Sequence, residues 1–100
     1  MNLKQQVEVC LREVPATRDS DITLTVEIWK RYYPHSIIKA PNGEIYVNLN
    51  DLYKLPREDN TKRYRAKFNE EGKYLTSNPQ IRKQRKQKEL EWRQELGYTN

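Results

Sequence analysis

Asp51-Leu-Tyr-Lys-Leu-Pro-Arg-Glu-Asp-Asn-Thr-Lys-Arg-Tyr-Arg-Ala-Lys-Phe-Asn-Glu-Glu-Gly72 contains two helical runs separated by a proline. Asparagines before the first run offer caps for a short helix that ends at Leu55, because Pro56 cannot continue it. Asp59 or Asn60 can cap a second helix that runs to about Glu71, where the following glycine ends it. Two short helices joined by a tight turn predict a helix-turn-helix.

The second helix of this pair has an aromatic face and a basic face. Thr61, Tyr64 and Phe68 lie about one turn apart and are predicted to face the core. A basic outer face opposite an aromatic seam is what docking in the major groove of DNA requires. The residues predicted on the outward arc are Lys62, Arg63, Arg65, Ala66 and Asn69.

Toward the N-terminus, a first amphipathic helix is predicted over Asn2–Val14, and Pro15 ends it. Its apolar stripe consists of Leu3, Val7, Cys10, Leu11 and Val14. Because Cys10 lies within this stripe, we interpret it as a small buried hydrophobe rather than a nucleophile.

The segment Ile22–Tyr33 allows two interpretations. Its alternating, β-branched start is typical of a strand. However, Asp19-Ser20-Asp21 offers three N-caps before it, Pro34 closes it, and Val26, Trp29 and Tyr33 have helical spacing. We predict a helix here.

A β-hairpin is predicted next, from two short apolar runs. Ile37–Ala40 and Ile45–Val47 flank the turn residues Pro41-Asn42-Gly43-Glu44. Asn-Gly is typical of a type I′ turn, in which both central residues have positive φ.

A last helix is predicted from its end residues. Ser77 or Asn78 caps it, Pro79 occupies its first position, and Gly97 lies past its end. Its thin apolar stripe (Ile81, Trp92, Leu96) predicts packing at the C-terminal end and a projecting basic start. The whole chain, 1–100, is thus predicted to be a single small α+β domain, mainly helical, with about five helices, one β-hairpin and a helix-turn-helix-like core.

The charge of the chain is concentrated in its second half. Residues 1–56 contain seven basic and seven acidic side chains, whereas residues 57–100 hold the remaining 12 of 19 Lys and Arg and the remaining 7 of 14 Asp and Glu, which is the entire net charge of +5. This pattern predicts a neutral platform of helices and hairpin, followed by a basic helical half that faces a polyanion.

Several short motifs, in a fixed order over residues 14–97, resemble a widespread group of small proteins from phages and prophages of Gram-positive bacteria. The motifs are Pro15-Ala-Thr-Arg-Asp-Ser-Asp21 with Trp29, Leu55-Pro56 before Lys62-Arg-Tyr-Arg-Ala-Lys-Phe68, Asn69-Glu-Glu-Gly-Lys-Tyr-Leu75, and Asn78-Pro-Gln-Ile-Arg82. The resemblance implies a phage setting and a helix-turn-helix-like fold. The chain departs from the group at Lys62, where an apolar residue is expected, and at Tyr64, where a small one is usual.

Composition excludes several classes of function. One cysteine, one histidine and three scattered glycines give neither a structural zinc site nor a phosphate-binding loop. We therefore predict no enzyme, no metal and no cofactor. The single cysteine fits a reducing compartment, and no apolar run approaches the ~20 residues of a membrane span. The sequence predicts a soluble protein in the cytoplasm of a bacterial host cell.

Two functions remain open. The first is a regulatory or accessory phage protein that binds DNA, with the hairpin as a winged-helix-like wing and RNA as a lesser alternative. The alternative is a small phage protein that binds a host or phage protein through exposed tyrosines such as Tyr32, Tyr33, Tyr74 or Tyr98, as an inhibitor, an adaptor or an anti-defence factor. The predicted nucleic-acid-binding residues are Lys62, Arg63, Arg65, Lys67, Asn69, Arg82, Lys83, Arg85 and Lys86.

Overall fold

The computed structural model describes the backbone of residues 1–95 and the side chains of residues 1–91. Leu96, Gly97 and Tyr98 and the side chain of Trp92, on which predictions above depend, lie outside this part. The elements in chain order are α1 (Leu3–Glu13), α2 (Asp21–Tyr32), β1 (Ile37–Lys39), β2 (Ile45–Val47), α3 (Glu58–Glu70) and α4 (Pro79–Glu95), with short 3₁₀ turns at Pro15–Arg18, Pro34–Ser36 and Leu52–Lys54.

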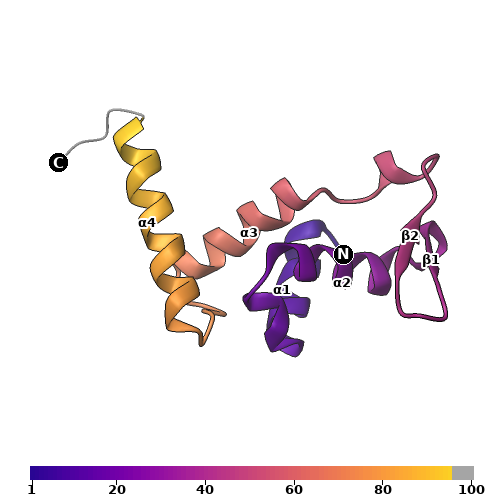
Figure 1. Cartoon of the computed structure of the whole chain (residues 1–100), viewed down its shortest axis with the longest axis horizontal. Helices are drawn as coiled ribbons and strands as arrows, with labels where there is room; N and C mark the ends of the chain where they lie inside the picture. The colour runs from indigo at the N-terminus through magenta and orange to yellow at the C-terminus, as the bar shows by residue number, and fades with distance from the viewer. Residues whose placement is uncertain (96–100) are drawn as a thin grey trace.

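The core lies where α1, α2 and α3 pack against one another (Figure 1). The hairpin extends from one end of this three-helix body and α4 stands at the other, so that the molecule measures 49 × 28 × 27 Å. The buried side chains that form the core cluster are Val7, Cys10, Leu11, Leu24, Ile28 and Phe68.

The apolar stripe predicted for the first helix is confirmed. Asn2 and Gln5 form a capping box, in which each side chain bonds the backbone of the other. Cys10 is fully buried, and this burial raises the pKa of its thiol to about 11, which keeps it protonated and unreactive.

Helix α2 confirms the helical interpretation of its segment. The Ser20 hydroxyl is the N-cap and accepts a hydrogen bond from the Thr23 amide at 3.2 Å. The buried face is formed by Leu24, Thr25 and Ile28. Val26, Trp29 and Tyr33, whose spacing indicated the helix, are half-buried. The Thr25 and Thr61 hydroxyls form one hydrogen bond of 2.6 Å, which links α2 to α3 and gives both buried groups a partner.

The β-hairpin is confirmed, but its turn differs from the prediction. Strands β1 and β2 are antiparallel, and Ile38 pairs with Tyr46. Among the residues of the turn only Gly43 has positive φ, and its amide donates to the Ala40 carbonyl at 3.0 Å. The loop is therefore a type I turn followed by a left-handed glycine, because Pro41 has the fixed negative φ that suits the second position of a type I turn.

The predicted helix-turn-helix is not present as two α-helices. The run that was expected to form its first helix makes only one 3₁₀ turn, Leu52–Lys54, without a side-chain cap. Five residues ended by a proline are too few to repay helix nucleation. The described residues therefore contain four α-helices instead of about five, and α3 begins at Glu58, earlier than predicted.

Helix α4 also contacts the body differently from the prediction. Its first turns are attached, since Ile81 and Arg85 are half-buried, whereas its side chains from Lys86 to Glu91 are exposed. Asn78 caps it as predicted, and its side chain accepts from the Gln80 amide at 3.0 Å. Within the described residues, no helix combines the length and apolar character needed to cross a membrane.

Candidate nucleic-acid interface

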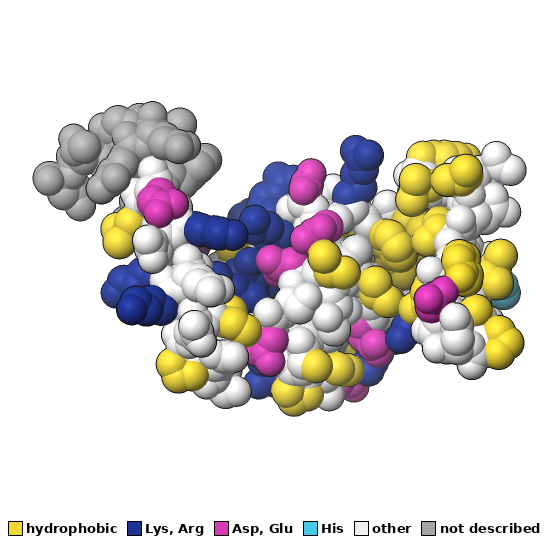
Figure 2. All heavy atoms as spheres, in the orientation of Figure 1, with side chains coloured by type: hydrophobic (Ala, Val, Ile, Leu, Met, Phe, Trp, Pro, Cys, Tyr) yellow, Lys and Arg dark blue, Asp and Glu magenta, His cyan; other side chains and the backbone are white. Residues whose placement is uncertain are grey.

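The predicted basic residues separate into an exposed group and a group that holds the fold together. Figure 2 shows that Lys and Arg side chains gather in the hollow between α4 and α3. We define the basic surface as the exposed members on these two helices that do not anchor α4: Lys62, Arg63 and Lys67 on α3, with Lys83, Lys86 and Lys88 on α4.

Arg65 does not face outward, which corrects the prediction. Its side chain is only 7% exposed and binds Asp21 in α2 in a bidentate manner, Nε to Oδ1 at 2.9 Å and Nη2 to Oδ2 at 3.0 Å. The sequence offered three acidic or hydroxyl caps before α2. Because Ser20 serves as the cap, the Asp21 carboxylate is free to pair across to α3. Arg65 is thus a structural residue.

Asn69 is likewise used inside the protein. Its side-chain amide donates to the carbonyls of Lys73 and Tyr74, at 3.0 and 3.3 Å, and its oxygen accepts from Arg65 at 3.3 Å. These bonds shape the turn after α3, where Tyr74 adopts φ of 53°. Asn69 was predicted to lie on the outward arc of the helix; in the structure it is half-buried and its side chain is used in these internal hydrogen bonds.

Two arginines of α4 anchor the helix to the body. Arg85 Nη1 donates to the carbonyl of Arg18 at 2.9 Å, and Arg82 Nε donates to the carbonyl of Thr76 at 2.5 Å. Desolvation lowers the pKa of Arg85 from its usual range, and the positive charge of Arg65 adds to the effect. Arg85 is half-buried, whereas Arg82 keeps most of its side chain exposed.

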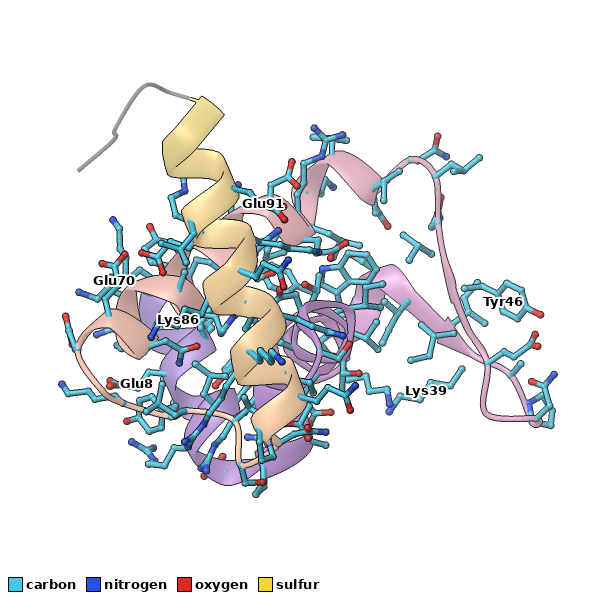
Figure 3. The ribbon with its side chains drawn as sticks, turned by 60° about the vertical axis from the view of Figure 1, so that its left-hand side comes forward. Glu8, Lys39, Tyr46, Glu70, Lys86 and Glu91 are labelled. Carbon is cyan, nitrogen blue, oxygen red and sulfur yellow. The ribbon has the colours of Figure 1, made fainter. Side chains whose placement is uncertain are left out.

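The side chains of the basic surface form few interactions within the protein itself. Lys67 lies over the Tyr64 ring with its Nζ 5.7 Å from the ring centroid, and Arg63 bonds Asn60, one turn away, at 2.5 Å. Figure 3 shows Lys86 projecting from α4, far from Tyr46 on the hairpin. Exposed cations on two neighbouring helices suit phosphate groups, which accept hydrogen bonds from both lysine and arginine.

An apolar groove at the opposite end was missed by the sequence analysis. It encloses about 610 Å³, and its lining residues are Trp29, Leu49, Leu52, Tyr53, Leu55, Pro56, Arg57 and Glu58. Trp29 Nε1 donates to the carbonyl of Pro56 at 2.8 Å, which fixes the ring at the groove. The run Leu52-Tyr-Lys-Leu55 supplies three of the lining residues. The sequence analysis assigned this run to a helix and therefore did not predict a groove.

The tyrosines predicted as protein contacts are mostly engaged in the fold. Tyr32, Tyr33 and Tyr74 pack against the core cluster, and the Tyr74 hydroxyl donates to Glu8 at 3.1 Å. This corrects their assignment as an exposed docking surface. Tyr53, which is 81% exposed beside the groove, is the tyrosine that meets that description.

Comparison with known proteins gives no identification: no family model, curated protein or solved structure matches the chain. In the described part of the chain, no three His, Cys, Asp or Glu side chains are grouped so that they could hold a metal ion.

Proposed function

We propose that this protein binds nucleic acid, with duplex DNA as the first candidate, through the basic surface of α3 and α4. The proposal is supported by the exposure of Lys62, Lys86 and the other members of the basic surface, and by the Lys and Arg side chains that gather between α3 and α4 in Figure 2. The other half of the chain, 1–56, has no net charge. A polyanion therefore has one preferred face to approach.

The proposed mode of binding is contact with the sugar–phosphate backbone. Arg65 and Asn69, two of the predicted nucleic-acid-binding residues, are bound to Asp21 and to backbone carbonyls instead. Lysine ammonium groups bind phosphate without reading sequence, and they dominate the remaining surface. Arg63 is the residue suited to a bidentate base contact, because its guanidinium is exposed at the side of α3.

A phage setting and a regulatory or accessory role in the host cytoplasm are proposed on the resemblance alone. The motifs that carry it include Leu55-Pro56 and Asn78-Pro79. In the structure these residues lie at the starts of α3 and α4, the two helices that carry the basic surface. The resemblance also includes Pro15–Asp21 and Trp29, so it extends beyond the two helices that carry the proposed interface.

The test is fluorescence anisotropy of a labelled random duplex at about 50, 100 and 200 mM salt. About five phosphate contacts predict a slope of log affinity against log salt near −4 to −5, which is a loss on the order of 10²–10³-fold over this range. Lys62→Ala combined with Lys86→Ala should flatten the slope by about two. Absence of binding at 50 mM salt would contradict the proposal.

The matched control replaces two exposed cations of the neutral half, Arg12→Ala with Lys30→Ala. This variant loses the same charge as the test variant, so it measures the effect of net charge alone. An equal loss of affinity in both variants would show that the basic surface is not the binding site. A single-stranded RNA and a duplex RNA of equal length, titrated in parallel, identify the preferred nucleic acid.

A further inference from the structure

The hairpin end of the molecule carries a concentration of exposed apolar side chains, which Figure 2 shows on the side away from α4. Isolated exposed hydrophobics are normal, but a contiguous group around a groove is typical of an interaction site. We define the apolar end as this groove together with the neighbouring exposed side chains Ile38 (61% exposed), Tyr46 (51%), Leu49 (83%), Leu52 (46%) and Tyr53 (81%).

The hairpin and the loop that follows it have no net charge, in contrast to the basic half, residues 57–100. Residues 32–56 contain only two lysines, Lys39 and Lys54, and two acidic residues, Glu44 and Asp51. Lys54 Nζ lies 3.4 Å from Asp51 Oδ1, so one of these charges is also neutralised locally. The net charge of +5 therefore resides elsewhere. Arg57 and Glu58, which also line the groove, carry opposite charges, so two copies of the chain can meet at this end without bringing together an excess of positive charge.

The hairpin is an incomplete sheet in the described structure. It has two strands of three residues each, β1 and β2, so each strand leaves one edge of amide and carbonyl groups without a strand partner. A two-stranded sheet is marginally stable in water, and three or more strands are needed for independent stability. Addition of a strand from another molecule would complete this sheet.

We propose that the apolar end binds a second copy of this chain, forming a two-fold symmetric dimer. Self-pairing satisfies both conditions at once: the hairpins join into a four-stranded sheet, and the lysines of α4 stay at the far ends of the two 49 Å molecules (Figure 1). The groove beside Trp29 receives an apolar side chain, Leu49 or Tyr53, from the other copy.

The test is sedimentation velocity of the full chain over about 5–200 μM, without nucleic acid and at about 150 mM salt. The expected result is a species of twice the 12.1 kDa monomer mass that increases with concentration. Leu49→Glu combined with Tyr53→Glu should shift the association at least tenfold toward monomer. Both side chains are more than 80% exposed, so these changes leave the folded monomer intact.

The matched control is Ile22→Glu combined with Leu90→Glu. Both of these residues are exposed hydrophobics outside the apolar end, at 62% and 52%. The control variant should dimerise as the unchanged chain does. A monomer at every concentration of the unchanged chain, or a dimer unaffected by the Leu49 and Tyr53 changes, would overturn the proposal. So would a control that dissociates equally.

This inference does not rest on the proposed function, because the mass is measured without nucleic acid. A dimer that binds no DNA would leave the inference standing and remove the proposed function. A monomer that binds DNA with the expected salt slope would do the reverse.

Discussion

Replacing Arg65 by alanine is expected to lower the free energy of unfolding by about 3–5 kcal/mol, the usual cost of leaving one partner of a buried ion pair uncompensated. The change would remove the ion-pair partner of Asp21, whose side chain is only 15% exposed. Marginal stability of a small domain makes such a loss a large fraction of the total. Urea unfolding followed by circular dichroism measures it.

Two further variants make this prediction specific. Arg63→Ala removes an exposed arginine from the same helix, and its expected effect is about 0.5 kcal/mol or less. Arg65→Met combined with Asp21→Leu removes both charges and fills their space with apolar atoms, so it should recover most of the lost stability. If Arg65→Ala unfolds at the same urea concentration as Arg63→Ala, the ion pair does not support the fold. Loss of DNA binding in an Arg65 variant would therefore be explained by a destabilised fold rather than by the loss of a contact with DNA.

Leu24→Ala is expected to cost about 2–5 kcal/mol, because it removes buried methyl groups and leaves a cavity among α1, α2 and α3. Leu24 is fully buried, and the core cluster to which it belongs is small. Because the core contains few apolar side chains, its remaining side chains can fill only a small part of the cavity that Leu24→Ala leaves. Thermal and urea unfolding should both show the loss.

The control for this change is Ile22→Ala, two residues earlier in the same helix. Ile22 is 62% exposed, so its truncation removes aliphatic atoms of similar size from water-exposed surface. Its expected effect is within about 0.5 kcal/mol. Similar losses in the two variants would mean that helix propensity, rather than burial, determines the response, and would contradict the described core.

The elements with strong local patterns could be predicted from the sequence. The stripe containing Val7 and Leu11 gave the first helix, and the capping residues and Pro34 gave the second, despite its strand-like start. The hairpin followed from its turn composition, although Pro41 selected a different turn type. These features depend on contacts within a few residues, which a single sequence displays.

The parts that could not be predicted depend on contacts between distant residues. Arg65 pairs with Asp21 across 44 positions, and helical periodicity alone cannot distinguish a buried arginine from an exposed one. Arg85 bonds a backbone carbonyl 67 positions away, at Arg18, which no side-chain pattern reveals. The groove likewise forms only when the loop that ends at Pro56 folds back against Trp29, 27 positions earlier in the chain.

The attachment of α4 has a consequence for how this protein can change over generations. The acceptors for Arg82 and Arg85 are main-chain carbonyls, which every residue type provides. The direction of the helix is therefore encoded by these two arginines and Ile81, and the fold places little constraint on the exposed positions between and beyond them. If α4 contributes to nucleic-acid binding as proposed, mutation of its exposed residues can alter that binding while the three-helix body stays the same.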